Sequence, residues 1–363
     1  MLLTDVTLRE GDQMPGRAFT AEEKVACTRT LDELGVPYIQ PGFPATGERD
    51  QQVISELAGT TDAEIVALAR ALEGDIDAAL EADADVVEVF VSASDRHLEH
   101  LLGTSREGML SMLGEALDYI HDHGRTAHVT LADAFRTDHE HLVELIETVP
   151  RAQFVSLADS VGARTPATVE DYLDGLDGHV AFDRLGVHFH DDMGCGTANA
   201  LAAYHAGVGK ADVSIAGLGE RAGNSALEEV AVACTVDHDD TLGLDSGTLI
   251  PACRSVLETL GEEYGERRAV LGRKVAEHES GVHTAAMLSD PATLEPFDPG
   301  YFGGQRRLVF GEPTGRGSAR RLLQRADIEP DEGTISAYLD ALATVGPVDL
   351  DEAIALGQRE FGA

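Results

Sequence analysis

The chain has 363 residues, of which 65 are acidic and 27 basic, giving a formal net charge of −38. Nucleic-acid binding is disfavoured because phosphates need a basic face, and no apolar stretch approaches the roughly 18 residues of a membrane span. The acidic residues pervade the chain, which we interpret as adaptation to high salt; a functional acidic patch is the alternative.

The N-terminal residues form an apolar run without a basic leader or a small-residue cleavage site, so no export signal is indicated. Cys27, Cys195, Cys234 and Cys253 are scattered and form no C-x-x-C pair. Neither a disulfide framework nor a cysteine zinc site is therefore expected. A cytoplasmic location fits best.

Short β-branched runs alternate with helical patterns, as in βα units around a parallel sheet. The expected strands are residues 2–8, 38–41, 64–69, 86–92, 127–131, 154–158, 185–190 and 211–215. Eight such units predict an α/β fold, a closed (β/α)₈ TIM barrel. Gly194-Cys195-Gly196 lacks the third glycine of a dinucleotide fingerprint, which disfavours an open doubly wound sheet.

After about residue 272 the strand rhythm stops and prolines punctuate a loop-rich segment. Helical patterns return at residues 318–325, 334–344 and 350–359. We therefore predict a catalytic barrel over residues 1–272 and a small, mainly helical accessory subdomain over residues 273–363. No C-terminal feedback-regulatory domain is expected.

The chemistry of such barrels lies at the carboxyl ends of the strands. Arg9 and Glu10 follow strand one, Asn224 follows strand eight, and His188 and His190 close strand seven, two apart and so on one face. Closure makes strands seven, eight and one neighbours. Two imidazoles, a carboxylate and an amide oxygen then form a plausible metal site.

Several of these features have structural alternatives. Arg9 could be an ion-pair partner of Glu10 or Asp12 rather than a catalytic residue. Asp191 and Asp192 could hold the imidazoles or cap the following helix.

Five motifs together resemble the acetyl-CoA-dependent 2-oxo acid synthases of the DRE-TIM group, which include 2-isopropylmalate, citramalate and homocitrate synthases. They are Asp5-Val6-Thr7-Leu8-Arg9-Glu10-Gly11-Asp12-Gln13, Ser94-Asp95-Arg96-His97-Leu98, His188-Phe189-His190-Asp191-Asp192-Met193-Gly194, Gly217-Leu218-Gly219-Glu220-Arg221-Ala222-Gly223-Asn224 and His278-Glu279-Ser280-Gly281-Val282-His283. The glycine-rich fourth motif resembles the synthases rather than the related acyl-CoA lyases.

The resemblance implies that a divalent ion (zinc, manganese or magnesium) is bound by four residues and chelates the 2-oxo acid. The four implied ligands are Glu10, His188, His190 and Asn224. Arg9 would stabilise the alkoxide formed when acetyl-CoA attacks, and His283 matches the family's base, delivered across a homodimer interface by analogy. His278 could share this function or be an ordinary loop residue.

The candidate substrate-binding residues are Gln13, Leu68, His128, Thr130 and Ser160. By the same resemblance, homocitrate synthases carry a His and an Arg at the positions of Leu68 and His128. Those two residues help to recognise the distal carboxylate of 2-oxoglutarate. Losing the guanidinium weakens selection for a diacid, so 2-isopropylmalate or citramalate is the favoured product. Glu10 and Cys195 are more homocitrate-like, and homocitrate synthase remains the alternative.

Ala132 departs from the family, because it occupies the position of a glutamate that helps organise catalysis, and a methyl group cannot transfer a proton. Asp133 or another carboxylate could substitute. A metal-dependent aldolase or lyase and a catalytically weakened regulatory paralogue are the other hypotheses. For coenzyme A, the candidate basic cluster is Arg306, Arg307, Arg316, Arg320 and Arg321, although a solvated helix face explains Arg320 and Arg321 equally well.

Overall fold

The structure is a computed structural model that describes residues 1–362. These residues divide into two compact units. The first comprises Met1–Asp245 and Ala252–Glu263, and the second comprises Ser246–Pro251 and the chain from Tyr264 onward. The division thus lies somewhat earlier than the sequence boundary at residue 272, and a short segment that includes the start of α11 (Leu249–Leu260) joins the second unit.

A closed barrel of eight parallel strands forms the first unit. The strands are β1 (Leu2–Asp5), β2 (Tyr38–Gly42), β3 (Glu64–Arg70), β4 (Val86–Ser92), β5 (Thr126–Ala132), β6 (Phe154–Asp159), β7 (Leu185–Phe189) and β8 (Lys210–Val213). They pair in sequence order, and β1 closes the ring against β8, with Leu2 opposite Lys210. The predicted TIM barrel is confirmed.

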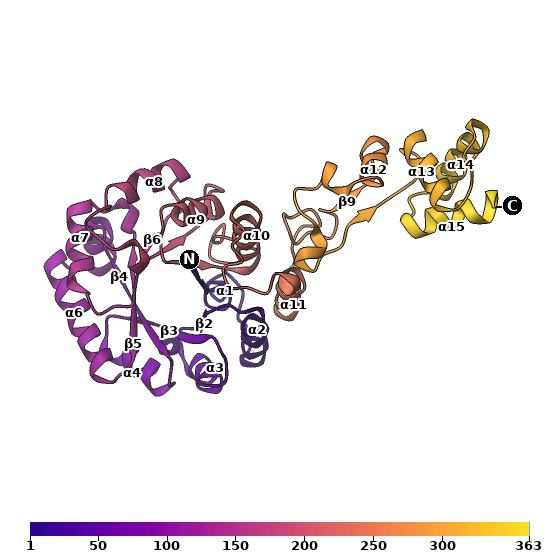
Figure 1. Cartoon of the computed structure of the whole chain (residues 1–363). Coiled ribbons are helices and arrows are strands. Elements are labelled where there is room, and N and C mark those ends of the chain that lie inside the picture. Colours follow the sequence, from indigo (N-terminus) through magenta and orange to yellow (C-terminus); the bar gives the residue numbers. More distant parts are fainter. Residues whose placement is uncertain (363) are drawn as a thin grey trace. The chain divides into compact units, whose positions relative to one another are not determined.

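Helices surround this ring of strands (Figure 1). They are α1 (Thr7–Gly11), α2 (Ala21–Leu34), α3 (Glu48–Leu57), α4 (Glu73–Glu81), α5 (Asp95–His97), α6 (Arg106–Asp122), α7 (His139–Thr148), α8 (Pro166–Asp174), α9 (Gly196–His205) and α10 (Leu227–His238). Local chemistry fixes some ends: Thr20 and Glu23 form a reciprocal capping box before α2. Among residues 1–362, no helix is both long and apolar enough to cross a bilayer.

The first strand ends at Asp5, whereas the sequence predicted a strand over residues 2–8. Asp5 accepts hydrogen bonds from the backbone nitrogen of Thr7 (3.0 Å) and from its hydroxyl (2.8 Å). These bonds turn the chain out of β1, so that residues 7–11 form α1 instead of continuing the strand. His190 likewise lies beyond the end of β7, and it forms an isolated bridge with Asn224.

The second unit is mainly helical, as the sequence predicts. It contains β9 (Glu277–His278), α12 (Gly281–Met287), β10 (Arg307–Leu308), α13 (Arg316–Arg325), α14 (Glu332–Val345) and α15 (Leu350–Phe361). Its helices enclose an apolar core that includes Phe310, Leu322 and Tyr338, and the Tyr338 hydroxyl donates to the carbonyl of Ala353. Burial of such large side chains stabilises this unit by its own core.

Candidate metal centre

A short helix, α1, presents Arg9 and Glu10 at the carboxyl end of β1. The helix is tied to the barrel because the Thr7 hydroxyl accepts a hydrogen bond from the backbone nitrogen of Ile215, 2.8 Å away, just beyond β8. Glu10 is almost fully buried. The turn at Asp5 therefore sets the position from which both side chains extend.

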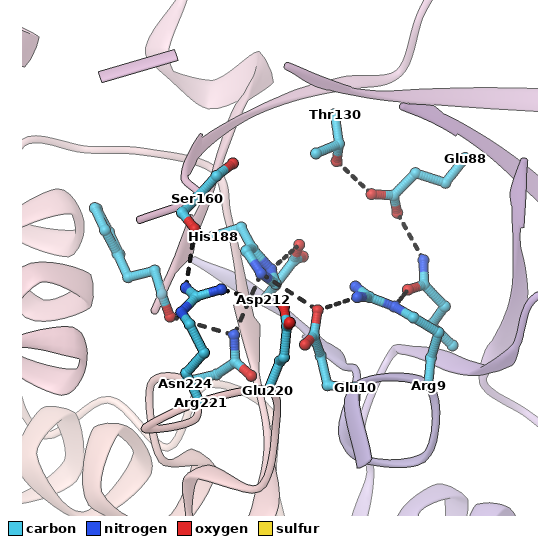
Figure 2. Close-up of polar contacts among 12 residues, drawn as sticks. Arg9, Glu10, Glu88, Thr130, Ser160, His188, Asp212, Glu220, Arg221 and Asn224 are labelled. Atoms are coloured by element: carbon cyan, nitrogen blue, oxygen red, sulfur yellow. Dashed lines mark hydrogen bonds and ion pairs between the residues drawn. The ribbon is translucent and has the colours of Figure 1, made fainter. Parts of the chain in front are cut away.

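Glu10, His188 and His190 meet at one corner of the barrel, with one ligand atom from each lying within 4.8 Å of the others. His188 Nε2 is 3.6 Å from Glu10 Oε1. Asn224 joins them, since its Nδ2 lies 3.2 Å from His188 Nε2 (Figure 2). The structure thus brings together all four residues that the sequence proposed as metal ligands.

Three of these residues carry buried polar atoms without a hydrogen-bond partner: Glu10 Oε2, His190 Nδ1 and Asn224 Oδ1. Unpaired buried polar atoms are costly and rare. Here they belong to a carboxylate, an imidazole and an amide of residues that meet at this corner, and these groups offer the mixed nitrogen and oxygen donor set that zinc, manganese or magnesium can use. The residues present fit a divalent cation.

The protonation states suit the same purpose. Burial lowers the pKa of His190 to about 4, assisted by the charge of His188, so this imidazole is neutral at pH 7 and keeps a free lone pair. Burial alone would raise the pKa of Glu10, but the charge of Arg9 above all, together with the neighbouring His188 and His190, holds it below its ordinary value. Glu10 is therefore a carboxylate.

Asp212 on β8 orients His188 from behind. His188 Nδ1 donates to Asp212 Oδ2 at 3.2 Å, which leaves Nε2 facing the corner as an acceptor. A carboxylate behind a histidine commonly fixes the tautomer of a metal ligand. Sequence reasoning missed Asp212, although a buried strand with charges at alternate positions, Lys210 and Asp212, was a usable signal.

Arg9 begins a second polar chain. Its guanidinium contacts Glu10, and its Nε donates to Gln40 Oε1 at 2.6 Å. Gln40 in turn donates to Glu88 Oε2 at 3.3 Å, and the Thr130 hydroxyl donates to Glu88 Oε1 (Figure 2). Gln40 and Glu88 were also missed, although a glutamate within the otherwise apolar run of β4 was a visible anomaly.

The loop at residues 217–224 needs its glycines to place Asn224. Gly223 has φ +88°, and a Cβ there would lie 1.8 Å from the Gly217 carbonyl oxygen. The Gly217 oxygen accepts from the Asn224 backbone nitrogen at 3.0 Å. A side chain at Gly223 would break this close approach.

Gly219 is a sharper test of the same loop, because a Cβ there would lie 2.0 Å from Asn224 Oδ1. We expect Gly219→Ala to displace the amide and to weaken Co²⁺ binding at least about tenfold, as losses around metal ligands commonly do. Titration of Co²⁺ into the folded variant measures this. Gly74→Ala in α4 is the control, since its Cβ would meet nothing within 4 Å; equal affinities in the two variants would contradict the prediction.

The two aspartates after His190 serve the loops. Asp191 Oδ1 accepts from the backbone nitrogen of Gly196, the first residue of α9, at 2.6 Å. Asp192 receives two hydrogen bonds from Arg221, at 2.9 and 3.0 Å. The helix contact therefore belongs to Asp191, and Asp192 instead anchors the residue 217–224 loop.

The predicted substrate-binding residues fall in different places. Leu68 is nearly buried in β3, and Thr130 is half-buried beside Glu88. Gln13 is exposed and lines a cavity of about 260 Å³ together with Arg9. Ser160 Oγ accepts from the Asp133 backbone nitrogen at 2.9 Å, and its carbonyl accepts from Arg221.

His128 lies in an aromatic group at the base of the barrel. Its ring packs edge-on against Tyr38 and Phe154, the first residues of β2 and β6, and its Nε2 is 3.1 Å from Gln153 Oε1. Burial lowers its pKa to about 3, with a contribution from the charge of Lys210. His128 is thus a neutral, packed side chain at this position.

Asp133 does not face the metal corner. It has φ +62°, accepts two hydrogen bonds from Arg136 (2.6 and 2.7 Å) and one from Ser94. Glu88 is a buried carboxylate beside the face of β5 that carries Ala132, since it contacts Thr130, two residues earlier on the same face.

His283 lies on α12 in the second unit, where it is exposed. Gly281 before it is required for packing, because a Cβ there would lie 2.4 Å from the Gly315 nitrogen. The arginines of the basic cluster have local partners. The pairs are Arg306 with Glu295, Arg307 with Glu277, Arg316 and Arg320 with Glu332, and Arg321 with Ser289.

The sequence matches two family models. One, described as HMGL-like, matches residues 1–256, and the other, described as homocitrate synthase post-HMGL domain-like, matches residues 270–347. The homocitrate synthase AksA of Methanopyrus kandleri is 37% identical over 349 residues, covering 95% of this chain and 88% of the relative. A protein of the same organism named "Probable 2-isopropylmalate synthase" is also 37% identical, covering 94% of this chain and 69% of its own.

Solved structures agree on the fold. The hydroxymethylglutaryl-CoA lyase of Pseudomonas aeruginosa superposes with a TM-score of 0.67 at 24% identity, covering 76% of this chain and 96% of the lyase. The HMG-CoA lyase of Brucella melitensis gives 0.63 at 21% identity, covering 72% and 97%. The resemblance found in the motifs is confirmed: the chain belongs to the HMGL-like family and, within it, to the acetyl-CoA-dependent 2-oxo acid synthases that include homocitrate and 2-isopropylmalate synthases.

Proposed function

We propose that this enzyme condenses acetyl-CoA with a small 2-oxo acid that has an apolar side chain, as in 2-isopropylmalate or citramalate synthesis. The observation that carries the proposal is the buried corner beside Arg9, where potential ligand atoms of Glu10, His188 and His190 lie within 4.8 Å of one another and Asn224 contacts His188. A divalent ion held by these four residues would polarise the keto group of the 2-oxo acid.

The protein residues have distinct tasks in this proposal. His283, delivered from the second unit in a homodimer, takes a proton from the acetyl methyl group, and the resulting carbon nucleophile attacks the keto carbon. The guanidinium of Arg9 stabilises the negative charge that develops on the keto oxygen. Hydrolysis of the thioester then releases coenzyme A and makes the condensation irreversible.

The choice of 2-oxo acid rests on the side chains deeper in the barrel. Leu68 offers an apolar contact, while Glu88 is a buried carboxylate that already accepts from Gln40 and Thr130. His128 is neutral and packed against the base of the barrel, so it gives no charge to a second substrate carboxylate. These features favour a monocarboxylate such as pyruvate or 2-oxoisovalerate.

Homocitrate synthesis from 2-oxoglutarate is the second candidate. It is favoured by the name of the Methanopyrus relative and by the description of the model that matches residues 270–347. Glu88 argues against it, because this carboxylate already accepts from Gln40 and Thr130 and occupies the ammonium of Lys210, and the neutral His128 offers no charge to a distal carboxylate of the substrate.

The test is thiol release from acetyl-CoA by the purified full chain, at high salt because of its net charge of −38, with Mn²⁺, Mg²⁺ or Zn²⁺. Pyruvate, 2-oxoisovalerate and 2-oxoglutarate are compared. We expect kcat/KM for a monocarboxylate to exceed that for 2-oxoglutarate about tenfold or more, since an unpaired buried group costs about 1–3 kcal/mol and about 1.4 kcal/mol corresponds to a factor of ten. Preference for 2-oxoglutarate would establish the homocitrate alternative. Absence of release with all three acids would refute the synthase proposal in favour of a lyase or a regulatory paralogue.

A further inference from the structure

A lysine is buried among carboxylates inside the barrel. Lys210 on β8 has no exposed surface, and its Nζ lies 3.0 Å from Asp212 Oδ1 and 3.7 Å from Glu88 Oε2. Glu88 belongs to β4, which stands opposite β8 in a closed ring of eight strands. The contact between Lys210 and Glu88 must therefore cross the barrel interior.

Asp212 and Glu88 are connected by hydrogen bonds to different residues of the candidate metal centre. Asp212 accepts the Nδ1 hydrogen of His188. On the other side, Glu88 accepts from Gln40, which accepts in turn from Arg9. Lys210 is thus the one ammonium, among the contacts described, that joins the chain behind His188 to the chain behind Arg9.

A glycine on the neighbouring strand leaves room for the Lys210 side chain. A Cβ at Gly186 would lie 3.1 Å from Lys210 Cε and 2.3 Å from Ser156 Oγ, so the glycine leaves space for the lysine stem. Buried carboxylates are stable only when a cation or several hydrogen-bond donors compensate them. Without Lys210, Asp212 and Glu88 would be two like charges facing one another across a dry interior.

We propose that Lys210 is a positioning residue of the metal centre: its ammonium holds Asp212 and Glu88 in place, and through them fixes the orientations of His188 and Arg9. The described ion pairs of Lys210 are with Asp212 and Glu88 and not with the four proposed metal ligands, so it would act through those carboxylates. The inference rests on the metal site proposed above and extends it to the opposite wall of the barrel.

The test replaces Lys210 by methionine, which keeps much of the stem but removes the charge. We expect folded Lys210→Met to bind Co²⁺ at least tenfold more weakly than the parent, and its visible Co²⁺ absorption bands to shift because His188 has turned. The control is Lys24→Met. Lys24 is equally buried and also bridges two carboxylates, Asp12 (2.6 Å) and Asp50 (2.9 Å). The Lys24→Met variant should bind Co²⁺ with parental affinity.

If Lys210→Met does not fold, a double variant provides a second test of the same role. Lys210→Met/Glu88→Gln removes one carboxylate together with the ammonium, and it should fold but still bind Co²⁺ weakly because Asp212 has lost its partner. Parental affinity and parental bands in either folded variant would overturn the role of Lys210. If the parent chain itself binds no Co²⁺, the proposed metal site fails instead, so the two failures are distinguishable.

Discussion

His188→Ala is expected to remove the bound divalent ion and to lower turnover by at least about 10³-fold. His188 is the centre of the corner, since it contacts Glu10, Asn224 and Asp212 at once. A metal ion that polarises a carbonyl supplies several kcal/mol of charge stabilisation, and about 4 kcal/mol corresponds to a factor of 10³ in rate. Metal content after dialysis and the steady-state rate are the measurements.

His205→Ala is the matched control for this experiment. His205 ends α9, is exposed, and lies 2.9 Å from His238 through their Nε2 atoms, away from the four proposed ligands. The control should keep stoichiometric metal and near-parental turnover. Stoichiometric metal in His188→Ala would show that the site lies elsewhere.

Arg9→Gln is expected to reduce kcat by about 10²–10³-fold while the metal stays bound. Loss of one preorganised donor to a developing oxyanion has an effect of this size. The four metal ligands remain, although Glu10 loses a cationic neighbour. Arg9→Lys should recover only part of the rate, because an ammonium cannot reproduce the contacts of a guanidinium with both Glu10 and Gln40.

The reference for Arg9 is Arg29→Gln, which removes an exposed arginine paired with Glu56 on the surface. Its kcat should remain within about twofold of the parent, as surface ion pairs contribute little. If Arg9→Gln retained the parental kcat, Arg9 would be a structural ion-pair partner of Glu10, the alternative that the sequence left open.

The fold was predictable because several strands, β3, β4 and β6 among them, are short and rich in apolar residues, as expected for a parallel sheet buried on both faces, and because the strands alternate with helical patterns. The ends of the strands were less predictable. At residues 2–8 the apolar run continues past the strand, and only the hydrogen bonds from Thr7 to Asp5 decide that the chain turns into α1. Periodicity cannot show such side-chain contacts.

The proposed metal ligands could be grouped from sequence because they follow strands that closure makes adjacent. Asp212 and Glu88 stand out in the sequence as charges within buried strands, but they and Gln40 could not be joined to this group, because alternation gives only the face of a residue and not the side chain that it contacts. The packing of His128 could not be predicted from sequence either, since its contacts with Tyr38 and Phe154 join residues far apart along the chain.

The pairing of Lys210 with Glu88 across the barrel has a consequence for how specificity can change over evolution. A relative that recruited a cation at position 88 to accept a diacid would place it against the ammonium of Lys210, and the first substitution alone would be strongly disfavoured. In the proposed function, substrate choice would thus depend on residues from opposite walls of the barrel, so a change of substrate would involve β4 and β8 together.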